Sequence, residues 1–163
     1  SSYGDREKKL EILKDPRCGA FAVIRLCTYF LAYFCVAFCI RFSPRVGLCW
    51  TLALVLERGL SGLAVAAFPM AKNTGLAHTF ATAADRESVQ KILIVLSVLL
   101  AAALIALGGG ALVVAALLML WRYHHVAVKE FGGITGDLAG WFLQKAEFWM
   151  LAALAASQWG GIL

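Results

Sequence analysis

Charged side chains interrupt the apolar segments of this chain, and such residues are the first candidates for chemistry. Arg58 lies near the middle of an apolar segment at about 46–68, directly after Glu57. Glu147 lies inside another segment, at about 138–157. An ionisable residue inside a membrane is costly and usually serves binding, transport or catalysis. We therefore expect Arg58 either to pair with an acidic residue of another helix or to bind an anion.

A glycine-rich stretch at 132–140 leads into the last apolar segment and reads Gly-Gly-Ile-Thr-Gly-Asp-Leu-Ala-Gly. A glycine-rich loop that enters a helix offers free backbone N–H groups to an anion. Asp137 can hold Mg²⁺ together with phosphate oxygens, but it can equally be a helix N-cap. The spacing of Gly136 and Gly140 also permits close helix packing. Glu147 follows on nearly the same helical face, where we expect it to share a cavity with Asp137.

A polar loop at 69–80 provides a third candidate. It contains Lys72, Gly75 and His78, together with one asparagine and two threonines. Lys72 and neighbouring amide donors could hold a phosphate. The alternative is an ordinary solvated connection between helices. The pair His124-His125 lacks further metal ligands nearby, and we expect it at a membrane interface.

The composition indicates an integral membrane protein. Of the 163 residues, 61% are hydrophobic and 15% are charged, whereas soluble domains carry about 25% charged residues. So small a chain cannot bury that much apolar surface in an aqueous core. The net charge of +5 is spread between the apolar segments, which argues against a nucleic-acid partner and for the lipid bilayer.

Five apolar segments are long enough, at about 20 residues, to cross a membrane. They lie at about 19–40, 46–68, 89–107, 111–128 and 138–157. The sequence predicts an all-α, polytopic bundle of about five transmembrane helices within 19–157, after a short amphipathic helix within 1–18. We expect one membrane-embedded domain over 1–163. Because glycine weakens helices, the triglycine at 108–110 predicts a hairpin; one long helix over 92–121 is the alternative.

The loop charges predict the orientation in the cell membrane. Residues 1–18, 69–91 and 122–136 carry ten lysines and arginines, whereas the two opposite connections carry only Arg41 and Arg45. The positive-inside rule therefore places the N-terminus and the 69–91 and 122–136 loops in the cytoplasm. The sequence leaves association into a homo-oligomer open.

Four motifs, taken in order, resemble the cobalamin synthase family (adenosylcobinamide-GDP ribazoletransferase). They are the charged opening at 6–19, the Arg-Gly-Leu-Ser-Gly at 58–62, the Phe-Pro-Met-Ala-Lys-Asn-Thr-Gly-Leu at 68–76, and the Gly-Ile-Thr-Gly-Asp-Leu-Ala-Gly at 133–140 followed by Glu147. The resemblance covers essentially the whole chain. That family has an aspartate-rich motif upstream, so we expect this chain to be a C-terminal portion with the main metal site before Ser1.

The resemblance implies a membrane transferase of late cobalamin biosynthesis. It would join adenosylcobinamide-GDP to α-ribazole, or to its 5′-phosphate, with Mg²⁺ and release of GMP. Asp137, Arg58 and Lys72 would be catalytic, and Asp137 would also be a metal ligand. The implied substrate-binding residues are Asp15, Arg17, Ser61, Gly75, Thr135, Gly136 and Glu147.

Two other functions are compatible with the same residues. Embedded charges such as Arg25, Arg58 and Glu147 also suit a small transporter. Transporters often contain internal repeats, and we find no convincing similarity between the first and last pairs of segments. A membrane phosphotransferase that acts on a lipid alcohol is the second alternative.

Overall fold

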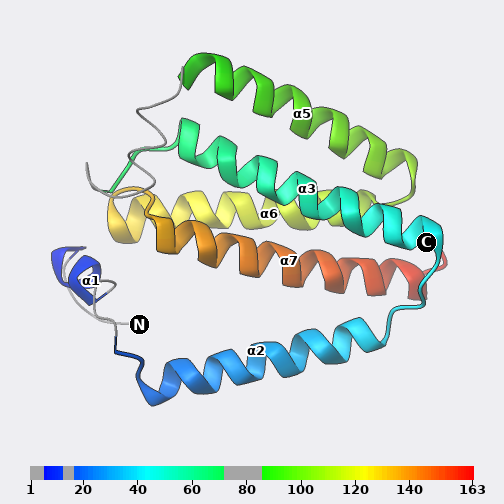
Figure 1. The fold of residues 1–163 in the computed structure, drawn as a ribbon, viewed down its shortest axis with the longest axis horizontal. Coiled ribbons are helices and arrows are strands. Elements are labelled where there is room, and N and C mark those ends of the chain that lie inside the picture. Colours follow the sequence, from blue (N-terminus) through cyan, green and yellow to red (C-terminus); the bar gives the residue numbers. More distant parts are fainter. Residues whose placement is uncertain (1–5, 13–16, 72–85) are drawn as a thin grey trace.

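The computed structural model describes residues 6–12, 17–71 and 86–163, and within them the fold is all-α (Figure 1). The helices are α1 (Arg6–Ile12), α2 (Ala20–Phe38), α3 (Pro44–Ala67), α5 (Arg86–Ala106), α6 (Gly110–Val126) and α7 (Gly136–Trp159), and a π-helical turn (Ala127–Phe131) follows α6. The predicted helical bundle is confirmed. In the same residues, the sole β-type pairing is an isolated bridge between Met70 and Ile134.

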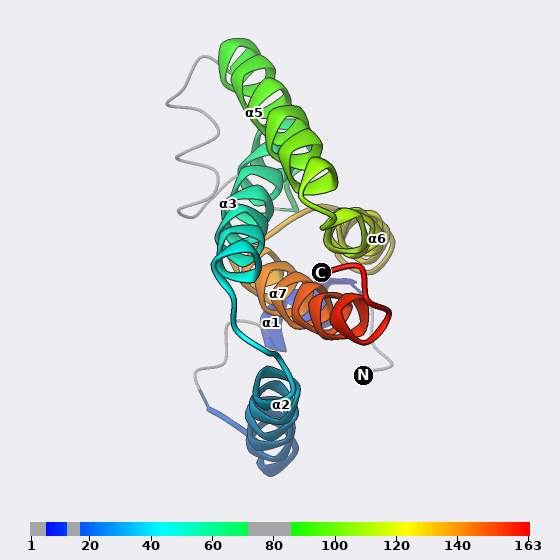
Figure 2. The ribbon, with the colours of Figure 1, turned by 90° about the vertical axis from the view of Figure 1, so that its right-hand side faces the viewer.

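Helices α3, α6 and α7 form the centre of the bundle. Helix α5 packs on α3, and α2 packs on α7 at the opposite side (Figures 1 and 2). The core between the central helices contains Leu56, Leu112, Tyr123, Phe142 and Met150, all almost fully buried. Helix α2 contains no buried residue. Its apolar side chains therefore suit a lipid environment more than a protein core.

Among the described residues, four stretches have the length and composition of membrane spans. They are Ala20–Phe38, Pro44–Ala67, Arg86–Ala106 and Gly110–Phe131. Helix α7 has 24 residues, which is long enough to cross a bilayer, but it carries Asp137, Lys145 and Glu147 in its first half. The chain is thus a multi-pass membrane protein.

The triglycine predicted as a break forms the turn between α5 and α6. Helix α5 ends at Ala106 and α6 begins at Gly110, so the hairpin is confirmed and the single long helix is wrong. Gly108 adopts a φ of 88°, a left-handed conformation that favours glycine. Arg45 donates from Nε and Nη2 to the carbonyl of Leu107, at 2.9 and 2.6 Å, which ties this turn to the start of α3.

The connections alternate between the two ends of the bundle. Helix α1, residues 69–71 and the π-helical turn lie at one end, called here the α1 end (Figure 1). The α2–α3 connection, the α5–α6 turn and the C-terminus lie at the opposite end. At the α1 end, Lys9 of α1 forms an ion pair with Glu130 of the π-helical turn. The short N-terminal helix therefore docks beside the glycine-rich entry to α7.

Candidate functional site

Two of the predicted motifs meet through their backbones at the α1 end. The N–H of Ile134 donates to the carbonyl of Pro69 at 2.8 Å, and the N–H of Ala71 donates to the carbonyl of Ile134 at 3.0 Å. Ile134 is itself buried. The segment that leaves α3 is thereby paired with the glycine-rich segment that enters α7, although about 64 residues separate them in the sequence.

Gly133 is what allows the two segments to approach so closely. A Cβ atom at this position would lie 2.5 Å from the backbone N of Ala71 and 2.6 Å from the carbonyl oxygen of Pro69. Those neighbours are backbone atoms already fixed by the bridge, so they cannot rotate aside as a side chain would. The site requires glycine here for steric reasons.

We expect Gly133→Ala to separate the two segments and to lower the free energy of unfolding by about 1–3 kcal/mol, as overpacked positions do. Thermal unfolding of the purified protein, followed by tryptophan fluorescence, measures the change. Gly136→Ala is the matched control, because a Cβ at Gly136 meets no atom of a described residue within 4 Å. Equal stabilities for the two variants would contradict the steric argument.

The first turn of α7 presents Asp137 on its exposed side. Thr135 is the N-cap, and its hydroxyl accepts from the N–H of Leu138 at 3.3 Å. The N-cap interpretation of Asp137 is therefore wrong, because Thr135, two residues earlier, already caps the helix. The carboxylate of Asp137 has no capping task and remains exposed.

The close-packing interpretation of Gly136 and Gly140 is also wrong. Both glycines are exposed, and no atom of a described residue lies within 4 Å of a Cβ built on either of them. Together with Asp137 they form an open face at the start of α7. The N–H groups of Gly136 and Asp137 belong to the first turn, where a helix leaves its donors without internal partners. This face can therefore receive an anion.

The end of α3 is held beside this face by α5. Arg86 and Gln90 both donate to the carbonyl of Ala66 in the last turn of α3. The last carbonyl groups of a helix have no N–H partner within that helix. Here two side-chain donors take the place of the missing N–H. The two bonds fix the point from which residues 69–71 leave for the bridge with Ile134.

A second polar cluster lies deeper in the bundle. Glu57 is fully buried and accepts from Nη1 of its neighbour Arg58 at 2.6 Å. Arg58 thus pairs within its own helix, and the predicted pairing with an acidic residue of another helix is wrong. Its side chain is 56% exposed, whereas that of Glu57 is 0% exposed. The second carboxylate oxygen of Glu57 has no hydrogen-bond partner in the part of the chain that is described.

Glu147 connects α7 to α2 at a similar depth. The hydroxyl of Tyr33 donates to Oε1 of Glu147 at 2.8 Å. Ten residues separate Glu147 from Asp137, which corresponds to about 15 Å along the helix axis. The two carboxylates therefore lie at different levels of α7, and a cavity shared by both stays a prediction.

The structure describes some of the predicted site residues and places them at different levels of the bundle. Asp15, Lys72 and Gly75 lie outside the described residues. Arg17 is exposed just before α2, and Ser61 is half-buried on α3, one turn after Glu57. Thr135, Gly136 and Asp137 lie together at the open face, whereas Arg58 and Glu147 belong to the deeper level.

Sequence reasoning did not select Glu57 or Tyr33. Glu57 was visible as a carboxylate inside an apolar segment, and its position next to Arg58 was the available signal. Tyr33 gave none, because its partner Glu147 lies 114 residues away. A lone tyrosine in an apolar helix is common, so only the packing of α2 on α7 reveals the hydrogen bond.

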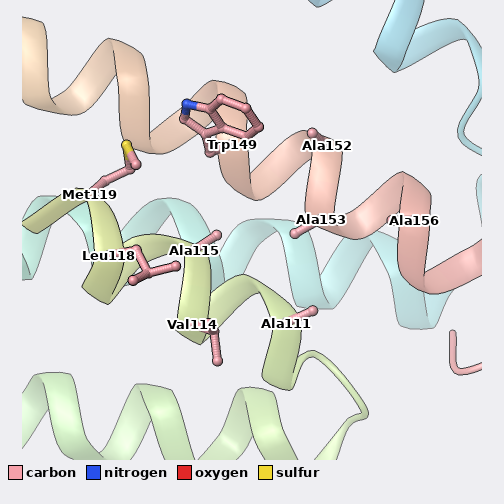
Figure 3. Close-up of a pocket in the computed structure, with 9 residues that line it drawn as sticks. All are labelled: Ala111, Val114, Ala115, Leu118, Met119, Trp149, Ala152, Ala153 and Ala156. Carbon is pink, nitrogen blue, oxygen red and sulfur yellow. The ribbon is translucent and has the colours of Figure 1, made fainter. Parts of the chain in front are cut away.

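A large apolar groove between α6 and α7 is a poor candidate for phosphate chemistry. It is lined by small and apolar side chains of both helices, among them Ala115, Met119, Trp149 and Ala153 (Figure 3). None of its lining residues can be charged. A groove of this kind cannot compensate the charge of a phosphate, so the open face at Asp137 is the better candidate.

The described residues offer only partial ligation for a metal ion. They contain no cluster of three or more histidine, cysteine, aspartate or glutamate side chains. Mg²⁺, however, commonly uses one or two carboxylates and takes its other ligands from water and substrate phosphates. Asp137 fits the first of these roles as a single exposed carboxylate.

Residues 1–155 match the family described as cobalamin-5-phosphate synthase. The chain belongs to this family. The family resemblance inferred from the four motifs is thereby confirmed, and neither a transporter nor a lipid-alcohol phosphotransferase is favoured by the match.

Several curated relatives carry the name adenosylcobinamide-GDP ribazoletransferase. The protein of Lachnoclostridium phytofermentans is 39% identical over 95% of this chain and 59% of its own length. Those of Pseudomonas syringae pv. tomato and Geobacillus sp. are 32% and 31% identical, over 94% and 91% of this chain. The chain spans about three fifths of the length of these relatives, between 59% and 62%. No solved structure matches the chain.

Proposed function

We propose that this chain contributes to a membrane transferase that joins adenosylcobinamide-GDP to α-ribazole or its 5′-phosphate and releases GMP. The observation that carries the proposal is the open face at the start of α7, where Asp137 and two first-turn N–H groups closely follow Ile134, the residue that pairs with the segment leaving α3. The names of the relatives specify the substrates. The reaction is the attack of a ribazole hydroxyl oxygen on the phosphoanhydride, with GMP as the leaving group.

The proposed chemistry depends on charge at the open face. The N–H groups of Gly136 and Asp137 would bind a phosphate oxygen at the helix N-terminus. Asp137 would accept the proton of the attacking hydroxyl or hold Mg²⁺ beside the phosphates. The metal ion, when bound, neutralises charge on the transferring phosphate. Lys72 follows Ala71 in the sequence, and we propose it as a further phosphate ligand.

Arg58 has a different role in this proposal from the one the motif implied. Its guanidinium already compensates Glu57, and Arg58 lies about nine residues, or roughly 14 Å along the axis, from the end of α3. We propose that the pair, together with Glu147 and Tyr33, positions α2, α3 and α7 below the open face.

The activity is tested with protein expressed in membranes from its complete reading frame. Adenosylcobinamide-GDP, α-ribazole and Mg²⁺ are supplied, and cobalamin and GMP are followed by chromatography. We expect both products in equal amounts, and neither when α-ribazole is omitted. A correctly inserted protein that forms no cobalamin would exclude the transferase.

We also propose that the α1 end faces the cytoplasm, because the described residues of the segments at that end include eight lysines and arginines. Cys18 and Cys39 are exposed at opposite ends of α2 and allow a direct test. We use variants in which either Cys18 or Cys39 is the single cysteine of the chain. In intact cells, we expect a membrane-impermeant maleimide to label Cys39. Cys18 should react only after permeabilisation, and the reverse pattern would invert the orientation.

A further inference from the structure

Two cationic side chains, one from α2 and one from α7, line a small cavity between these helices. It has a volume of about 270 Å³ and is lined by Ala22, Arg25, Leu26 and Tyr29 of α2 and by Trp141, Gln144 and Lys145 of α7. The cavity lies between the open face at Asp137 and the Tyr33–Glu147 hydrogen bond. Trp141 and Lys145 follow Asp137 at intervals of four residues, so all three share one face of α7.

The cavity has an excess of positive charge. Among the described residues that line it, none is acidic. Within the described part of the chain, neither Arg25 nor Lys145 forms an ion pair, whereas Arg58 and Lys91 each have a carboxylate partner. Two cations that face one space in a membrane-embedded region are costly unless an anion accompanies them. A snorkelling Arg25 would explain one of the cations, but not Lys145, which is half-buried further along α7.

The walls of the cavity are held by contacts on its deeper side. The hydroxyl of Tyr29 donates to the carbonyl of Gln144 at 3.3 Å, and the ring of Tyr29 lies 6.0 Å from that of Phe148. These contacts join α2 to α7 just below the two cations. The side-chain nitrogen atoms of Arg25 and Lys145 take no part in these contacts and are available to bind a ligand.

We propose that this cavity binds a phosphate group through Arg25 and Lys145. Phosphate is the anion that both side chains recognise well, arginine through a planar fork of donors and lysine as a point charge. The volume is just below the range of about 300–1,000 Å³ for sites of drug-sized ligands. It therefore suits one phosphate with a small attached group, and not a complete nucleotide.

Two sources can supply this group, and the site does not depend on the reaction proposed above. A phospholipid headgroup can enter from the membrane, and a water-soluble phosphate ester can enter from the α1 end. The purified protein in neutral detergent is therefore titrated with two kinds of probe. Dihexanoyl phosphatidic acid, compared with dihexanoyl phosphatidylcholine, represents the lipid. Inorganic phosphate and ribose 5-phosphate represent the soluble ligand, with potassium chloride at equal ionic strength as the blank.

We expect at least one probe to bind, as seen by a rise in the thermal midpoint. Arg25→Gln and Lys145→Gln should each weaken its affinity about tenfold or more, as removal of a charged hydrogen-bond partner does. Arg122→Gln and Lys129→Gln are matched controls on exposed cations elsewhere at the same end, and should change the affinity less than twofold. Preference for phosphatidic acid identifies a headgroup site, and preference for the soluble probes identifies a substrate site.

The proposal is overturned if no probe binds better than chloride, or if the control variants weaken binding as much as the cavity variants. Two further variants apply if the glutamine variants do not fold. Arg25→Lys retains the charge and should keep most of the affinity. Ala22→Trp fills the cavity without removing either cation and should abolish binding; unchanged binding in this variant would place the phosphate elsewhere.

Discussion

Asp137→Asn is expected to reduce the rate of cobalamin formation by about 10²–10³-fold, the usual cost of removing a general base or a preorganised charge. Asparagine preserves the size of the side chain and its ability to form hydrogen bonds, but it cannot accept the proton of the ribazole hydroxyl and is a poorer ligand for Mg²⁺. The rate is measured in membranes with saturating adenosylcobinamide-GDP and α-ribazole.

The free energy of unfolding of this variant should fall by no more than about 1 kcal/mol, because Thr135 caps α7 and Asp137 contributes only its charge near the helix N-terminus. Glu87→Gln is the matched control: Glu87 is an exposed carboxylate in the first turn of α5, at the same end of the bundle. We expect normal rates from that variant. A rate near the wild type for Asp137→Asn in well-folded protein would remove Asp137 from the reaction.

The helices of this protein were predictable because lipid imposes a simple rule. Each span needs about 20 apolar residues, and the segment predicted at about 19–40 corresponds to α2 (Ala20–Phe38), that at about 46–68 to α3 (Pro44–Ala67). The triglycine at 108–110 marked the hairpin for a local reason, the conformational freedom of glycine. Composition and local breaks were enough for the fold class.

The arrangement of the site was less predictable because it depends on contacts between distant segments. The bridge between Met70 and Ile134 uses backbone atoms only, so no side-chain pattern in the sequence predicts it. The spacing of Gly136 and Gly140 is the same whether the glycines meet a neighbouring helix or open space. Only the packing of α7 shows that both glycines, and Asp137 between them, are exposed.

The pairing of Arg58 shows why an embedded charge does not by itself identify a ligand site. Glu57 and Arg58 are adjacent in the sequence, and successive helical residues point in directions about 100° apart. Glu57 consequently points into the core and Arg58 away from it. The long arginine side chain bends back to the carboxylate, which the sequence could not distinguish from pairing with another helix.

Arg58→Met is therefore expected to destabilise the fold by about 3 kcal/mol, because it leaves the buried carboxylate of Glu57 without its cation. The second oxygen of Glu57 has no partner among the described residues, so no other donor there can substitute. Replacing both residues, as Glu57→Leu with Arg58→Met, should recover most of the loss, since an apolar pair needs no compensation. Unfolding by a graded sodium dodecyl sulfate titration, followed by tryptophan fluorescence, measures the three free energies.

An exposed ion pair serves as the control, because it shows how much stability is lost when the carboxylate is not buried. Lys91 and Glu87 form an ion pair whose side chains are 72% and 78% exposed, and Lys91→Met should cost about 0.5 kcal/mol or less. A loss in Arg58→Met as small as that would mean that Arg58 does not stabilise Glu57. Arg58 would then be available to a substrate phosphate, as its motif implied, whereas a large loss that the double variant recovers assigns the arginine to the architecture below the open face.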